Sequence, residues 1–187
     1  MPKTFLVADP SFFDPYYAVK YNMSIPEYNY FIISNLNELS EPGDEFLFFG
    51  NISRGNYNET KILFNTLNIH CKKILIDKHD QLHFTPAEQT LLFDAIYEAP
   101  GIYRKIYNER FYTILMPFTK SFIKFDTEQA GGDTYVVTTT SKYDLDGMVF
   151  KNNILDVNIH KWGGKALYIE QLPSIIEEVE KMTREED

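Results

Sequence analysis

The chain has 187 residues, of which 44% are hydrophobic and 24% charged, and its formal net charge is −9. These values predict one globular domain over residues 1–187 and argue against an intrinsically disordered chain. The excess of acid argues against a nucleic-acid partner, because a phosphate-binding groove needs clustered Lys and Arg. Aromatic residues make up 16% of the chain, and we assign most of them to the core.

Cys71 is the only cysteine, so no disulfide can form within the chain, which is typical of a reducing compartment. The apolar run before Asp9 and Pro10 is too short for the hydrophobic region of a signal peptide. No apolar run approaches the ~18 residues that a membrane helix needs. We therefore expect a cytoplasmic protein with no membrane partner.

The first half of the chain alternates predicted strands with predicted helices. Short apolar runs predict buried strands at Thr4–Ala8, Glu45–Phe49 and 72–76. Apolar residues at helical spacing predict helices over 26–40 and 58–67. Thr85, followed by Pro86, marks the start of another helix. This β-α-β-α-β order predicts parallel strands covered by helices.

The second half of the chain changes to strand-like segments separated by Gly and Asn pairs, which indicate turns. The predicted strands are 102–107, Arg110–Met116, 134–138, 147–150, 154–159 and 166–169. Residues 173–182 carry apolar side chains on one face and acids on the other, which predicts a final amphipathic helix.

Polar residues follow the three strands predicted in the first half. They are Asp9, Pro10 and Ser11 after the first strand, Gly50 and Asn51 after the second, and Asp77, Lys78, His79 and Asp80 after the third. Because ligands of open α/β sheets bind beyond the carboxyl ends of the strands, we expect these segments to converge on one cleft.

The order and spacing of these segments resemble the calcineurin-like metallophosphoesterases. Members of that family carry D-x-H after the first strand, G-D after the second and G-N-H-D or G-N-H-E after the third, with a histidine and a G-H-x-H run on later strands. The sequences around these motifs also resemble those of the family, in the segments FLVADPSFFDP, PGDEFLFFGNISRG, LNIHCKKILIDKHD and NNILDVNIHKWGGKALYIEQLPSII. The resemblance covers nearly the whole chain. It implies an α/β fold with a central β-sandwich of mixed and parallel strands flanked by helices.

The family's mechanism implies two divalent metals such as Mn or Fe, and this chain departs from the ligand set that holds them. Asp9 matches the first aspartate. Ser11 stands at the histidine of D-x-H, and a hydroxyl is a poor replacement for imidazole. Asn51 stands at the aspartate that bridges the metals, and its amide has no formal charge. Lys78 stands at the asparagine of G-N-H-D, where an ammonium would repel a cation.

The ligands on the later strands are also missing. The sequence has no histidine between His83 and His160, which removes three ligands together, and Thr138 and Thr140 stand in the register of the G-H-x-H run. Asp9 alone cannot hold two metals. We therefore expect no metal cofactor and no confident catalytic residue, and we interpret Asp9 as an aspartate that caps its loop.

A vestigial site remains in this interpretation, made of Asp9, Ser11, Asn51, Lys78, His79 and Asp80. The resemblance implies a role for His79 near the leaving group, and the alternative is a loop histidine bound to a carboxylate. Lys78 has two readings of equal weight, an ion pair with Asp9 or, together with Asn51 and His79, an anion site.

Three functions follow from this reading. The first is a pseudoenzyme that reuses the phosphoesterase fold to bind a protein partner. Its size and its Asn, Lys, Ile, Phe and Tyr content favour a phage or mobile-element origin, with a host-takeover or anti-defence role as the hypothesis. The second is a metal-free protein that binds a nucleotide or phosphate, and the third is a residual metal-dependent phosphoesterase. Fold alone does not grant activity.

Overall fold

A computed structural model of the chain describes the backbone of residues 2–68, 70–77, 84–98, 101–107, 110–116, 133–138, 150–151 and 154–185. Side chains are described for residues 2–68, 70–76, 84–97 and 155–182. No helix within these ranges is both long enough and apolar enough to cross a membrane.

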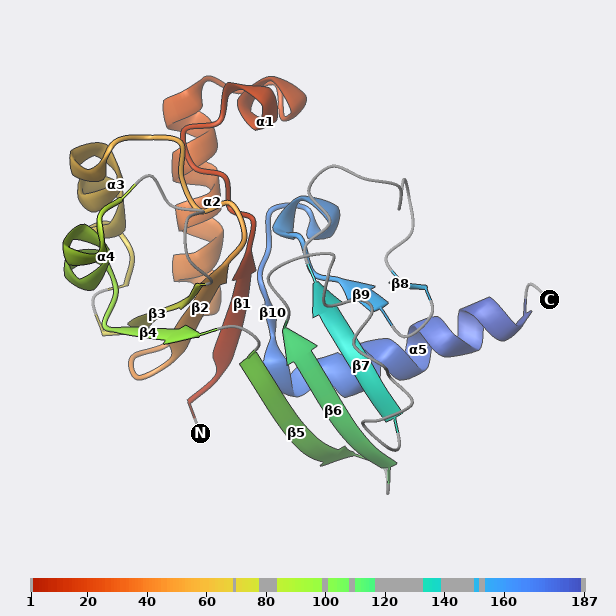
Figure 1. The fold of residues 1–187 in the computed structure, drawn as a ribbon. Coiled ribbons are helices and arrows are strands. Elements are labelled where there is room, and N and C mark those ends of the chain that lie inside the picture. The colour runs from red at the N-terminus through yellow and green to blue at the C-terminus, as the bar shows by residue number, and fades with distance from the viewer. Residues whose placement is uncertain are drawn as a thin grey trace.

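The fold is α/β, with a mixed five-stranded sheet flanked by helices (Figure 1). The elements of this first sheet and its helices are β1 (Thr4–Ala8), α1 (Pro15–Lys20), α2 (Ile25–Leu39), β2 (Glu45–Phe49), α3 (Tyr57–Phe64), β3 (Lys72–Asp77), α4 (Pro86–Leu92), β4 (Ala95–Glu98) and β10 (Leu167–Tyr168). Its strand order is β10-β1-β2-β3-β4, with β1 to β4 parallel and β10 antiparallel to β1.

A second five-stranded sheet has the order β5-β6-β7-β9-β8. The remaining elements are β5 (Gly101–Tyr107), β6 (Arg110–Met116), β7 (Asp133–Thr138), β8 (Phe150–Lys151), β9 (Ile154–Asp156), the 3-10 helices η2 (Ile159–Trp162) and η3 (Ile169–Gln171), and α5 (Leu172–Glu185). This sheet is also mixed, because β6, β7 and β9 run parallel while β5 and β8 pair antiparallel to their neighbours.

In the first sheet, β1, β2 and residues 74–76 of β3 are buried on both faces, which explains why these segments read as unbroken apolar runs. Successive residues of a strand point to opposite faces. Phe5 and Val7 accordingly join one core with α1, α2, α3 and α4, while Leu6 and Ala8 join a second core with β9 and α5. Figure 1 shows the four helices on one side of this sheet and α5 with the second sheet on the other.

Local sequence signals set where the helices begin. Ser24, Asn56 and Thr85 each accept a hydrogen bond from the backbone of a glutamate three residues on, and that glutamate bonds back to the cap. These capping boxes satisfy backbone N–H groups that the first helical turn leaves without partners. Proline within the first two positions of α2 and α4 also favours a helix start there, because it has no backbone N–H to satisfy and its φ suits a helix.

The predicted parallel order of the first three strands and the helix start at Thr85 are confirmed. The helix expected over 58–67 is shorter, because α3 ends at Phe64. Four elements were not predicted: α1, whose start is marked by Asp14 before Pro15, the short strand β4, and the 3-10 helices η2 and η3. Most of the strand expected at 147–150 lies outside the described residues.

The strand expected over 154–159 was wrong at its end. β9 stops at Asp156, Asn158 forms a single parallel bridge with Ala8, and η2 begins at Ile159. The Asn158 side chain accepts a hydrogen bond from the His160 backbone, so a local polar contact starts the helical turn. This turn brings the end of β9 to the carboxyl end of β1.

Candidate functional site

Three segments that are distant in the sequence meet at the carboxyl end of β1. The loop after β1 follows the loop after β2 through hydrogen bonds from the Ser11 and Phe12 backbone N–H groups to the Asn51 and Ile52 carbonyls, each 2.9 Å long. The third segment is the chain after β9, through its bridge to Ala8. The predicted convergence is therefore observed for the first two loops, and β9 supplies a contribution that the sequence did not indicate.

Asp9 lies at the centre of this region and is 1% exposed. Its Oδ1 accepts a hydrogen bond from the Asn51 backbone N–H at 2.5 Å, and its Oδ2 accepts one from the Asn158 side-chain amide at 3.0 Å. Each carboxylate oxygen thus faces a neutral N–H donor. This arrangement fits the interpretation of Asp9 as an aspartate that caps its loop.

Asn158 is held in position by the loop on which it lies. Its Oδ1 accepts from the His160 backbone, and its own backbone N–H donates to Asp156 Oδ1 at 2.9 Å. Asp156 is fully buried, and its other oxygen lies 2.9 Å from Lys161 Nζ. A buried ion pair with further hydrogen bonds fixes the geometry around it, so Asn158 presents its amide to Asp9 in one orientation.

The loop after β1 has an unusual backbone. Asp9, Ser11 and Phe13 have φ values of 51°, 48° and 61°. Left-handed conformations cost roughly 1–2 kcal/mol for residues other than glycine, and such strain persists where surrounding contacts over-determine it. Here the backbone ladder to the β2 loop and the hydrogen bond from the Phe13 N–H to the Asn29 side chain supply those contacts.

The other vestigial positions differ in their surroundings. The Ser11 hydroxyl is buried and has no hydrogen-bond partner among the described residues. The Asn51 side chain is exposed, and it is the backbone of Asn51 that contacts Asp9. Lys78, His79 and Asp80 lie outside the described residues, so the expected ion pair of Lys78 with Asp9 stays a prediction.

His160 joins this region to a cluster of tyrosines. Its ring stacks on Tyr17 with ring centroids 3.6 Å apart, and Tyr21 and Tyr28 lie around it. Burial lowers the pKa of His160 to about 4, with Lys20 acting in the same direction and a hydrogen bond to the Asp9 backbone opposing it. His160 is therefore neutral at pH 7.

Tyr17 and Tyr28 are buried, and Tyr21 is half-buried. Burial, assisted by the charge of Asp9, raises the pKa of Tyr17 to about 12, while a hydrogen bond with Asn158 lowers it. Tyr28 is fully buried and donates its hydroxyl proton to the Pro10 carbonyl. The cluster thus pins α1 and α2 to the loop that carries Asp9.

The described residues do not fit a two-metal centre. Within the described ranges, no three His, Cys, Asp or Glu side chains are grouped so that they could hold a metal ion. The N–H groups that face Asp9 have no lone pair to offer a metal, and the Ser11 hydroxyl is a weak ligand for ions such as Mn or Fe. Thr138 ends β7, and Thr140 lies outside the described residues.

Sequence reasoning missed Asp156, Asn158, His160 and Tyr17. A signal for three of them was present, because polar residues at every second position, 156, 158 and 160, begin within the strand predicted at 154–159 and would share one face of an extended chain. Tyr17 gave no such signal, because one tyrosine in an aromatic-rich sequence has no distinguishing neighbour.

Comparisons with known proteins bear on the fold alone. No protein-family model matches the sequence, and no curated protein does. A crystal structure of AQ665 from Aquifex aeolicus, described as a protein of unknown function, is similar with a TM-score of 0.66 and 12% sequence identity. The alignment covers 94% of this chain and 100% of that one. The two chains share an architecture over almost their whole length.

Proposed function

We propose that this chain is a non-catalytic protein built on a phosphoesterase-like fold, and that it acts by binding a protein partner. The observation that carries the proposal is the coordination of Asp9. Where the resembling family would place metal ions, both oxygens of this carboxylate accept hydrogen bonds from the neutral groups of Asn51 and Asn158.

The physical argument concerns charge and lone pairs. Two divalent ions a few ångströms apart repel each other, and a shared carboxylate offsets that repulsion. Asn51 places an uncharged amide where the resembling family has its bridging aspartate, and its backbone N–H donates a hydrogen bond to Asp9 Oδ1. Without the bridging carboxylate, the repulsion between two cations at this position would not be offset.

Metal content and hydrolysis together test the non-catalytic part of the proposal. We expect tag-free protein to contain far less than one Mn, Fe, Ni or Zn per chain by elemental analysis. We also expect no turnover of bis-p-nitrophenyl phosphate above a blank, even with added manganese. About two metals per chain, or turnover that disappears in Asp9→Ala, would instead establish a residual phosphoesterase.

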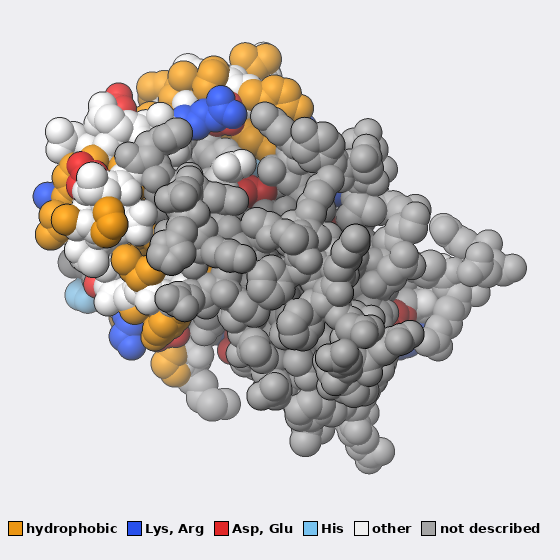
Figure 2. Space-filling model, viewed as in Figure 1, with side chains coloured by type: hydrophobic (Ala, Val, Ile, Leu, Met, Phe, Trp, Pro, Cys, Tyr) orange, Lys and Arg blue, Asp and Glu red, His pale blue; other side chains and the backbone are white. Residues whose placement is uncertain are grey.

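A surface for the partner is available at α1. Tyr16 and Val19 are 65% and 77% exposed although both are apolar or aromatic, and Figure 2 shows hydrophobic side chains gathered where Figure 1 places this helix. Exposed apolar groups of this kind favour protein contacts. Because α1 directly follows the loop of Asp9, a partner at this surface would lie next to the vestigial site.

Affinity capture from the native host tests the partner. We expect one dominant protein to co-purify with the wild-type chain and to be lost with Tyr16→Ser combined with Val19→Ser. A matched control is Ile62→Ser with Leu91→Ser, which alters two similarly exposed apolar residues on α3 and α4. Retention of the partner by the α1 variant would reject this surface, and an empty capture would argue against a protein partner.

A further inference from the structure

A cavity of about 300 Å³ lies at the other end of β1 from Asp9. Its walls come from the residues around the start of β1, the end of α2, and the chain from η2 through β10. The residues that matter for its chemistry are Lys3, Phe5, Trp162, Lys165, Tyr168 and Gln171. Ligand cavities span roughly 300–1,000 Å³, so this one suits a single small molecule.

The aromatic walls are held in place by contacts with neighbouring residues. The Trp162 indole donates its Nε1–H to the Asp156 carbonyl at 3.0 Å. Tyr168 meets Phe5 edge to face, with ring centroids 6.0 Å apart and an interplanar angle of 68°. The Tyr168 backbone N–H donates to Gln171 Oε1 at 3.0 Å, which orients that amide. Rings fixed in this way offer flat apolar surface at little entropic cost.

The charged residues that line the cavity are basic, although the chain as a whole is acidic. Its charged lining residues are Lys3 and Lys165, and among the described residues that line it none is acidic, whereas the chain has a net charge of −9. The Lys3 ammonium lies 3.9 Å from the largely exposed Glu41, which makes a weak pair, and the Lys3 backbone N–H donates to Asp44 Oδ1 at 2.7 Å. Two ammonium groups beside apolar walls attract an anion that carries apolar surface.

We propose that this cavity binds a small organic anion with a planar ring, such as a nucleoside monophosphate or an aromatic carboxylic acid. The ring packs on Trp162 and Tyr168, and the phosphate or carboxylate lies near Lys3 and Lys165. The proposal does not depend on the function proposed above, because the cavity and the Asp9 region share none of these residues.

Trp162 provides a direct readout, because it is the only tryptophan of the chain. Its fluorescence is titrated with AMP and with 4-hydroxyphenylacetate, which carry a ring with a phosphate or a carboxylate. Adenosine and inorganic phosphate serve as probes that keep only the ring or only the charge. We expect a saturable change with at least one of the two ring-bearing anions and binding at least about tenfold weaker for the two partial probes. Which anion binds more tightly distinguishes phosphate from carboxylate as the recognised group.

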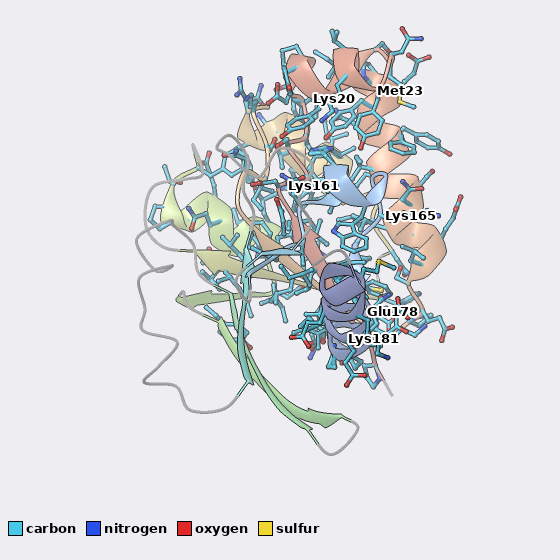
Figure 3. All side chains as sticks on the ribbon, turned by 90° about the vertical axis from the view of Figure 1, so that its right-hand side faces the viewer. Lys20, Met23, Lys161, Lys165, Glu178 and Lys181 are labelled. Carbon is cyan, nitrogen blue, oxygen red and sulfur yellow. The ribbon has the colours of Figure 1, made fainter. Side chains whose placement is uncertain are left out.

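Lysine variants test the role of charge. Lys3→Gln combined with Lys165→Gln is expected to weaken binding of the better anion by at least about tenfold. The control is Lys181→Gln, since Figure 3 shows Lys181 on α5, away from Lys165, which lies beside α2. This control is expected to change the affinity by less than about twofold.

Three results would overturn the proposal. The first is no saturable response to either anion by fluorescence and no heat of binding by calorimetry. The second is adenosine binding as tightly as AMP when 4-hydroxyphenylacetate does not bind, and the third is an unchanged affinity in the double lysine variant while circular dichroism shows that it is folded.

Discussion

Asp9 and Asn158 are 149 positions apart in the chain, and one hydrogen bond joins their side chains. At this scale the chemistry is that of matching donors to acceptors. The two carboxylate oxygens of Asp9 each accept a hydrogen bond from an N–H group. The Asn158 side chain donates a hydrogen bond from its amide NH₂ to Asp9 and accepts one from the His160 backbone N–H at its Oδ1. Each group therefore has a role that a single substitution can test.

Asp9→Asn should destabilise the protein by about 1–3 kcal/mol, because a carboxamide has one oxygen for two donors and one buried N–H then loses its acceptor. Asn158→Asp combined with Asp9→Asn should recover part of this loss. The carboxylate at 158 accepts from the new amide and still accepts from the His160 backbone. Urea denaturation of the single and double variants gives the coupling energy. Strictly additive effects would show that the two side chains do not interact.

His160 makes stability depend on pH. Its pKa is lowered from 6.5 to about 4 by burial, so the unfolded chain binds a proton below pH 6.5 that the folded chain refuses until about pH 4. The stabilisation from neutral His160 is complete above pH 6.5 and is lost as the pH falls from 6.5 to 4, amounting to about 3 kcal/mol in total.

Urea denaturation between pH 7 and pH 5 measures this loss. We expect His160→Gln to remove most of the pH dependence in this range, because glutamine does not titrate. His70→Gln is the matched control, since His70 is exposed at the turn before β3. An identical pH dependence in His160→Gln and the wild-type chain would contradict the assignment.

At the scale of elements, the turn after η2 shows why two adjacent glycines are not equivalent. Gly163 and Gly164 have φ values of 66° and 78°. A Cβ added to Gly163 would meet nothing within 4 Å, whereas one added to Gly164 would lie 2.4 Å from the Phe31 ring and 3.2 Å from Asn35 Nδ2 on α2. The turn thus packs directly against α2, and Asn35 donates to the Gly164 carbonyl.

Gly163→Ala should cost about 1–2 kcal/mol of stability, the price of a left-handed conformation. Gly164→Ala should cost more, about 2–4 kcal/mol, because overpacking against α2 adds to the same backbone term. Both losses of stability are measured from the shift of the urea midpoint, with the slope of the unfolding free energy against urea concentration unchanged. Equal losses in the two variants would mean that the Phe31 ring moves aside without cost.

At the scale of the whole molecule, β1 joins both cores through alternate residues, and α5 closes the second core. A chain organised around one shared sheet should unfold as one unit. We expect the loss of Trp162 fluorescence and of far-ultraviolet circular dichroism to coincide in urea. Two separated transitions would show that the second sheet and α5 unfold on their own.

The second core can be tested on a single helix. Leu172 is fully buried on α5, and Met182 on the same helix is 64% exposed. Leu172→Ala should destabilise the protein by about 2–5 kcal/mol because it leaves a cavity. Met182→Ala should change stability by at most about 0.5 kcal/mol. A small effect of Leu172→Ala would mean that α5 contributes little to the fold.

Elements with a local cause could be predicted from the amino-acid sequence. Apolar runs predicted β1, β2 and β3, helical spacing predicted α2 and α5, and Thr85 before Pro86 predicted the start of α4. It also placed Asp9 and Asn51 at neighbouring strand ends, because parallel strands bring their carboxyl ends to one edge. These features depend on the spacing of apolar residues along the sequence and on the residue types at the start of each helix.

The side-chain contacts of those residues depend on the packing of segments that are distant in the sequence. The hydrogen bond from Asn158 to Asp9 forms because the chain after β9 crosses to the first sheet, where Asn158 bridges Ala8 of β1, and no local pattern encodes a pairing across 149 residues. The stacking of His160 on Tyr17 and the cavity beside Trp162 arise in the same way, from the return of the chain after β9 onto β1 and α2. Sequence periodicity reports which face of an element is buried, whereas side-chain partners depend on how distant elements pack.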